Sequence, residues 1–199
     1  MVGTMSGQEH TSNLCVVRPR RRSCGFSLTE SLVACSVATT LAGLAIPPMN
    51  NMLHDLRMQS AVGSFVSALH LARSEAIKRN GRAVLCKSAD GQACSASGDW
   101  SQGWLVFHDG NNNAAFDEGE AMIGQHGAMP SGLRLSGNLP VSRYVSYSAT
   151  GTAKLTSGAF QAGTFTVCPA KTHQSAVRQI VLSPTGRPRT RAGLADDCG

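Results

Sequence analysis

The sequence predicts an α+β fold, in which one long N-terminal helix is packed on a C-terminal antiparallel β domain. Two observations support this prediction. Residues 26–80 carry first a continuous apolar run and then apolar side chains at steps of three and four. After residue 81 the chain breaks into short apolar runs separated by Gly, Asn, Ser and Pro. The length of 199 residues suits one modest domain with an appended segment and excludes a TIM barrel or a large multidomain enzyme.

The first 25 residues form a polar leader, and residues 26–46 form the apolar run. This run carries a single charge, Glu30, and ends before Pro47 and Pro48. A helix of this length spans roughly 30 Å, which is one hydrocarbon thickness. The basic end of the leader predicts a cytoplasmic N-terminus, so we expect a retained single-pass membrane helix with the C-terminal domain translocated. A cleaved secretory signal is the alternative, but no Ala-x-Ala site follows the apolar run.

Glu30 is the unusual residue of the apolar run, because a carboxylate inside a bilayer costs about 2.5–3.5 kcal/mol and needs a partner of opposite charge. The octapeptide GFSLTESL, residues 25–32, resembles the type IV prepilin signature. The resemblance implies that prepilin peptidase cleaves between Gly25 and Phe26 and N-methylates Phe26. It also implies that Glu30 assists assembly with other pilins.

The helical period continues through residues 47–80 as an amphipathic half, which an Asn-Gly pair ends. Its apolar stripe is expected to pack on the β domain. The segments LARSEAIKRN, residues 71–80, and WSQGWLVFHD, residues 100–109, resemble the GspH/FimT family of pilin-like proteins. The resemblance implies a type IV pilin-like fold in which residues 81–199 form the GspH/FimT-like β domain.

The β domain is expected to contain seven short strands with turn residues between them. Each is a run of three to six residues, rich in β-branched, aromatic or other apolar side chains. The expected strands are 82–87, 104–108, 121–125, 133–135, 143–147, 164–168 and 177–182.

An Asn- and Asp-rich loop follows the second expected strand and permits two interpretations. Its polar side chains occupy positions 1, 3, 5, 9 and 12 of an EF-hand-like calcium loop, namely Asp109, Asn111, Asn113, Asp117 and Glu120. However, Ala114 replaces the glycine of the sharp turn, and the flanks read as strands. A hairpin turn held by side chain to backbone hydrogen bonds is therefore the favoured alternative.

Four cysteines lie in the domain that we expect to be exported, and four cysteines allow three pairings. Cys86 with Cys94 closes a short loop, and Cys168 with Cys198 ties the C-terminal tail to a strand. An oxidising periplasm favours these two disulfides. Zinc binding is the alternative, but the sequence has no C-x-x-C motif.

Charge is segregated along the β domain. Residues 83–120 carry one base and six acids, whereas residues 121–195 carry eight bases and no acid. The basic stretch ends in the sequence GRPRTR, in which three arginines at alternate positions of an extended chain project to one side. This arrangement would attract a polyanion, although a plain solvated hairpin is the alternative.

The first four residues of this ending resemble the G-R-x-R motif of the FimT branch, which is implicated in DNA capture during natural transformation. The resemblance implies double-stranded DNA as a partner. The expected contact residues are Gly186, Arg187, Arg189 and Arg191, aided by Arg178 and Lys171.

The sequence contains no G-x-S-x-G elbow, H-E-x-x-H motif or Walker loop, so a non-enzymatic protein without a cofactor is expected. Two functions fit. The first is a FimT-like minor pilin of a type IV pilus that binds DNA without sequence preference. The second is a GspH-like structural tip subunit of a type II secretion pseudopilus. Expected partners are other major or minor pilins or pseudopilins, prepilin peptidase, the inner membrane and, for the first function, double-stranded DNA.

Overall fold

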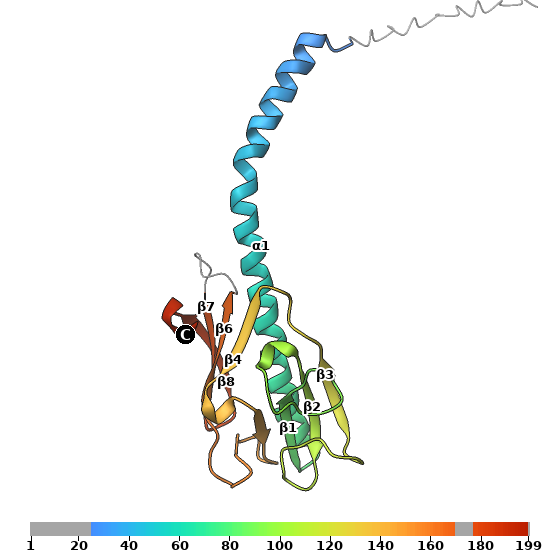
Figure 1. Ribbon diagram of the computed structural model, residues 1–199, viewed down its shortest axis with the longest axis vertical. Helices are drawn as coiled ribbons and strands as arrows, with labels where there is room; N and C mark the ends of the chain where they lie inside the picture. The colour runs from blue at the N-terminus through green and yellow to red at the C-terminus, as the bar shows by residue number, and fades with distance from the viewer. Residues whose placement is uncertain (1–24, 170–176, 199) are drawn as a thin grey trace, which may run out of the picture. The chain divides into compact units, whose positions relative to one another are not determined.

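The structure is a computed structural model that describes residues 25–169 and 177–198, except for the side chains of residues 44–51. The chain divides into two units, Met1–Leu44 and Ala45–Gly199. Helix α1, Leu28–Lys78, contributes to both units (Figure 1). Residues 1–24 of the predicted leader lie outside the described residues.

Within the described ranges, no helix combines the length and the apolar character that a membrane crossing needs. The predicted membrane segment, residues 26–46, ends among the residues whose side chains are not described. Its large apolar side chains up to Leu41 are exposed in the isolated chain, and they include Phe26, Leu32 and Val37. Membrane insertion therefore stays a prediction.

The second half of α1 buries one face against the β domain. The buried positions recur at steps of three and four, and they are Met58, Ala61, Val62, Phe65, Leu69, Ala72 and Ala76. The helix ends as expected: Asn80 takes a left-handed conformation with φ of 48°, and the Gly81 N–H donates to the Ala76 carbonyl at 3.1 Å. On the surface of the last turn, the Arg79 Nε donates to Glu75 at 2.7 Å, which lowers the pKa of that carboxyl.

Two antiparallel four-stranded sheets follow the helix (Figure 1). The first sheet has the order β3 (Met122–His126), β2 (Trp104–Asp109), β1 (Arg82–Lys87), β5 (Tyr144–Tyr147). The second has the order β4 (Leu133–Gly137), β6 (Gly163–Pro169), β7 (Val177–Leu182), β8 (Pro188–Gly193). All seven expected strands form, and the arginine-rich ending adds the eighth. The α+β prediction is confirmed.

The main core lies where both sheets meet the second half of α1. Phe65 of the helix stands edge-to-face against Trp100, Trp104 and Phe165, with ring centroids 5.2, 5.1 and 4.7 Å away. Trp104 belongs to the first sheet and Phe165 to the second, so this one helical side chain joins both. The Trp100 indole N–H donates to the Val141 carbonyl at 3.0 Å, which satisfies its polar atom inside the core.

Candidate nucleic-acid interface

The arginine-rich ending folds as the second strand of a hairpin. Between β7 and β8, the Ser183 N–H donates to the Arg187 carbonyl at 3.2 Å and the Gly186 N–H donates to the Ser183 carbonyl at 2.8 Å. Gly186 has φ of +76°, a conformation that costs glycine little. The turn sets the register, so that Arg189 lies opposite Val181 and Arg191 opposite Gln179.

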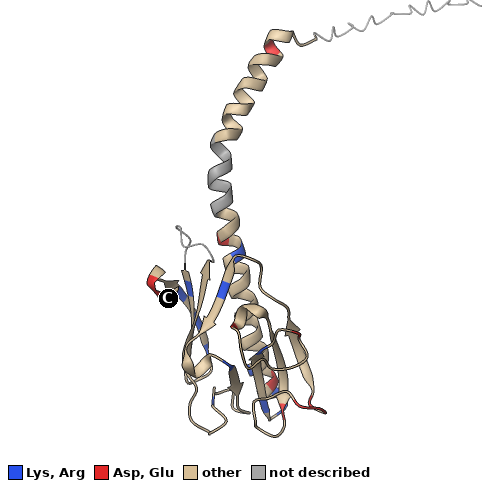
Figure 2. Ribbon diagram, in the orientation of Figure 1, with Lys and Arg blue, Asp and Glu red and all other residues tan. Residues whose placement is uncertain are grey.

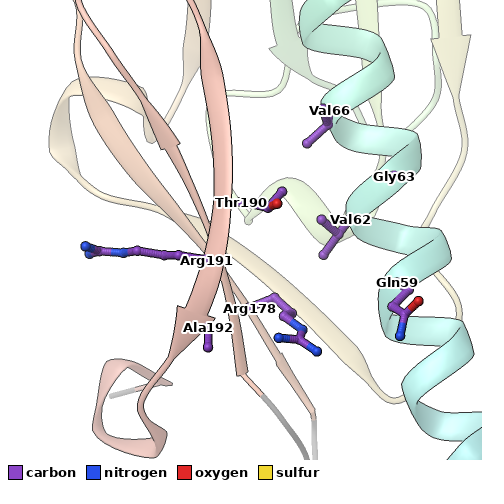
Figure 3. A pocket seen from close by; sticks show the side chains of 8 residues that line it. All are labelled: Gln59, Val62, Gly63, Val66, Arg178, Thr190, Arg191 and Ala192. Atoms are coloured by element: carbon purple, nitrogen blue, oxygen red, sulfur yellow. The ribbon is translucent and has the colours of Figure 1, made fainter.

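Arg189 and Arg191 lie on the face of the second sheet that points away from α1. The inward face is fixed by Ile180 and Leu182 of β7, which belong to the main core. Because side chains alternate along a strand, Arg189 and Arg191 take the outward face. Figure 3 shows Arg191 pointing away from the helix. Both are exposed, as is Arg187 in the turn, so all three guanidinium groups are accessible.

Gln179 holds one of these arginines in place. Its side-chain oxygen accepts a hydrogen bond from the Arg191 Nε at 2.7 Å. Gln179 itself is buried, with 6% of its surface exposed. The bond uses one of the five N–H groups of Arg191 and leaves the others free to bind an anion.

The register places a fourth arginine, Arg134 of β4, on the same outward face. Arg134 lies opposite Cys168 of β6, between Leu133 and the buried Leu135. Its side chain is 58% exposed and forms an ion pair with Asp99 at 3.2 Å. The alternation around Arg134 was a sequence signal for an outward position. The sequence does not show that β4 and β8 share one sheet.

Arg178 does not belong to this group, which corrects the expected contact set. It lies opposite Ala192 and shares the inward face with Ile180. Figure 3 shows Arg178 on the α1 side of the sheet and Arg191 on the opposite side. Lys171 lies outside the described residues.

Gly186 is also removed from the expected contact set, because it is buried. A Cβ at this position would collide with the Gly151 carbonyl and come within 2.9 Å of the Tyr147 ring. The glycine of the G-R-x-R motif therefore serves the packing of the turn. Only the arginines of the motif are available to a ligand.

The Asn- and Asp-rich loop uses its carboxylates internally. Asp109 accepts hydrogen bonds from the Asn113 and Ala114 N–H groups at 3.2 and 3.0 Å. Asp117 accepts from the side-chain amides of Asn111 and Asn113 at 2.8 and 2.6 Å, which lowers its pKa. Glu120 accepts from the Gly110 N–H at 2.9 Å.

These hydrogen bonds agree with the interpretation of the loop as a hairpin turn that its own polar side chains stabilise. Among the described residues, no three His, Cys, Asp or Glu side chains converge to hold a metal ion.

Both favoured disulfides are present in the structure. Cys86–Cys94 joins β1 to the following loop, and Cys168–Cys198 joins β6 to the short helix η3, Ala195–Cys198. The second bond fixes the chain just after β8, so the arginine strand is held at both ends.

The processing residues lie at the start of α1. Gly25 and Phe26 precede the helix and are exposed, while Glu30 lies in its first turn. The Glu30 N–H donates to the Ser27 Oγ at 3.2 Å, which makes Ser27 the N-cap. An acid in a first helical turn also interacts favourably with the helix dipole.

Acidic and basic side chains are separated in space as well as in sequence. Figure 2 shows Lys and Arg along the strands of the second sheet and a cluster of Asp and Glu at the loop that follows β2. Arg187, Arg189 and Arg191 are exposed and form no ion pair among the described residues, and grouped bases of this kind attract polyanions.

Comparison with known proteins decides the family. Residues 61–186 match the family described as type II transport protein GspH, and this match spans more than half of the chain. The chain belongs to the GspH family. GspH family members of this kind are minor pilins or pseudopilins of a type IV pilus or a type II secretion system, and so is this chain. The family match ends at Gly186, directly before the exposed arginines.

Individual relatives of this GspH protein come from several bacteria. The pilin-like protein PilA1 of Thermus thermophilus is 27% identical over an alignment of 177 residues that covers 83% of this chain and 96% of the relative. The type IV minor pilin FimU of Pseudomonas aeruginosa has a TM-score of 0.49 at 20% identity, covering 70% of this chain and 90% of its own. The minor pseudopilin EpsH from the type 2 secretion system of Vibrio cholerae has a TM-score of 0.44 at 17% identity, covering 67% and 94%.

Proposed function

We propose that this GspH family protein is a FimT-like minor pilin of a type IV pilus that binds double-stranded DNA without sequence preference during natural transformation. The observation that carries the proposal is the outward face of the second sheet. Arg189 and Arg191 stand side by side there, with Arg187 in the adjacent turn and Arg134 on the far strand. The protein acts by binding, without catalysis.

The chemistry of this face suits a phosphate backbone. Arginine guanidinium groups bind phosphate oxygens through paired N–H donors. Alternate residues of a strand lie about 6.8 Å apart, so Arg189 and Arg191 can meet separate phosphates. Ser136 of β4 lies two residues from Arg134 on the same face and adds a short hydroxyl side chain there. Contacts of this kind position a duplex and carry no sequence information.

Removal of the two strand arginines tests the proposal. In the double variant Arg189→Ala, Arg191→Ala, the affinity of the full chain for a fluorescent duplex at 0.1 M salt should fall by roughly tenfold, because two phosphate contacts are lost. Two duplexes of unrelated sequence should lose affinity equally. Fluorescence anisotropy of the detergent-solubilised chain measures both effects.

Arg57→Ala is the control for loss of positive charge away from the second sheet, since it removes one arginine from an exposed position on α1. It should leave the affinity within twofold of the wild type. A double variant that binds as tightly as the wild type would overturn the proposal.

One observation favours a second function, a GspH-like structural tip subunit of a type II secretion pseudopilus. The family match, residues 61–186, covers the last part of α1 and the strands β1 to β7 but ends before Arg187, Arg189 and Arg191. A structural subunit would need only the segment that the family match covers. Such a subunit interacts with neighbouring pseudopilins. Absence of duplex binding in the wild-type chain would support this function.

Both functions require the same maturation, which we include in the proposal. Prepilin peptidase cleaves between Gly25 and Phe26 and methylates the new amine, which then faces Glu30 of a neighbouring subunit during assembly at the inner membrane. The β domain is periplasmic. Intact-mass analysis of membrane-extracted protein should show loss of residues 1–25 and gain of one methyl group. A mature chain that begins after residue 46 would contradict this maturation.

A further inference from the structure

A groove between α1 and β8 takes no part in the proposed DNA binding, which uses side chains on the opposite face of the second sheet. The groove is open to solvent and has a volume of about 560 Å³. Its helix side consists of Gln59, Val62, Gly63 and Val66, and its strand side of Thr190, Arg191 and Ala192, with Arg178 reaching in from β7 (Figure 3).

One wall of this groove is an unpaired strand edge. The strand β8 is terminal in the order β4, β6, β7, β8. The bond from the Ser183 N–H to the Arg187 carbonyl makes that opposing pair a hydrogen-bonded one. Hydrogen-bonded and non-bonded pairs alternate along an antiparallel ladder, so the N–H and C=O groups of Thr190 and Ala192 point away from β7. An edge of this kind is a template for a further strand.

Arg178 gives the groove its charge. The side chain is partly buried, and among the described residues it takes part in neither an ion pair nor a side-chain hydrogen bond. A guanidinium that is partly removed from water without an anion is unfavourable. Its strand neighbour toward the groove is Ala192, whose small side chain leaves the guanidinium free to extend past β8. A carboxylate on a strand added beside β8 would lie within its reach.

A second copy of β8 does not fit this edge. Pairing two β8 strands would bring Arg189 and Arg191 of one copy beside those of the other, and like charges on neighbouring strands are destabilising. Pro188 also lacks the N–H that a symmetric ladder would use. The charge of the edge therefore favours an acidic strand from a different protein.

We infer that β8 receives an extended segment of a partner protein as a fifth strand of the second sheet, with a carboxylate of that segment bound to Arg178. Apolar side chains on either side of the carboxylate contact Val62 and Val66 of α1. This inference is independent of DNA binding, because Arg178 and the duplex contacts lie on opposite faces of the sheet.

A designed peptide tests the inference on the full chain in detergent. The probe is the blocked hexapeptide Val-Thr-Glu-Thr-Val-Thr, in which alternate residues place Val, Glu and Val on the α1 side. The control is the same peptide with Gln in place of Glu. We expect the Glu peptide to bind at least tenfold more tightly, and we expect it to slow hydrogen exchange at the amides of Thr190 and Ala192.

Two variants identify the contact. Arg178→Gln keeps much of the side-chain volume and should abolish the preference for the Glu peptide, while Arg189→Ala should retain that preference. Circular dichroism of both variants verifies the fold. Equal affinity for the two peptides, no binding of either peptide, or unchanged exchange at Thr190 and Ala192 would overturn the inference. Absence of duplex binding by the wild-type chain would count only against the proposed function.

Discussion

At the scale of single residues, Tyr147 is a buried side chain whose hydroxyl has no hydrogen-bond partner among the described residues. It lies at the end of β5, fully buried between α1 and the turn that contains Gly186. Burial raises its pKa, while the positive charge of nearby Arg73 acts in the opposite direction. The ring thus contributes apolar contact, and its hydroxyl costs free energy.

We predict that Tyr147→Phe raises the free energy of unfolding by about 1 kcal/mol, because it removes a buried hydroxyl that gains nothing in the folded state. Urea titration followed by tryptophan fluorescence measures the change. Tyr144→Phe is the control. The Tyr144 hydroxyl accepts a hydrogen bond from the Thr156 N–H at 3.3 Å, so its loss should lower stability slightly. A destabilisation of 1 kcal/mol or more by Tyr147→Phe would show that the hydroxyl has a partner.

At the scale of elements, the hairpin β7–β8 determines which arginines can act together. The sequence predicts the extended arginine segment, because Pro and Gly mark the turn and three arginines alternate. It cannot predict on which face of the sheet Arg178 lies, because that depends on which residues of β7 the helix covers. That face is set by Ile180 and Leu182 packing into the core, a contact between segments more than 100 residues apart in sequence.

The disulfide Cys168–Cys198 fixes the exit of this hairpin, and its loop spans 30 residues against 8 for Cys86–Cys94. Closing a longer loop constrains the unfolded chain more strongly. We predict that the double variant Cys168→Ser, Cys198→Ser loses about 3.5 kcal/mol of stability, and that Cys86→Ser, Cys94→Ser loses about 2.5 kcal/mol. Urea unfolding of the oxidised proteins measures both values. The reverse order would contradict a dominant role of loop entropy.

At the scale of the whole molecule, the periodicity of apolar residues in the sequence was sufficient to predict the order of the helix and the strands along the chain. Strict helical spacing before residue 80 and short strand-like runs after residue 81 predict the helix and seven of the strands, since each pattern reflects a local burial requirement. The grouping of the strands into two sheets was not available from the sequence, because strand pairing depends on long-range contacts. For the same reason, the sequence could not place Arg134 and Arg191 on one face.

The separation of charge is also a property of the whole β domain. The acidic loop after β2 and the arginines of β8 lie on different elements (Figure 2), and none of the ion pairs among the described residues joins them. A structural pseudopilin has no need of this separation. A DNA-binding minor pilin depends on it, because a duplex repels acids and attracts bases.

The salt dependence of duplex binding by the full chain tests the central claim most directly. If Arg187, Arg189 and Arg191 each neutralise one phosphate, a plot of log K against log salt should have a slope of about −2.7, and the double variant Arg189→Ala, Arg191→Ala should have a slope of about −0.9. Those two slopes would support binding through the outward face of the second sheet. A wild-type slope near zero, or equal slopes for the wild type and the double variant, would contradict DNA binding through these arginines.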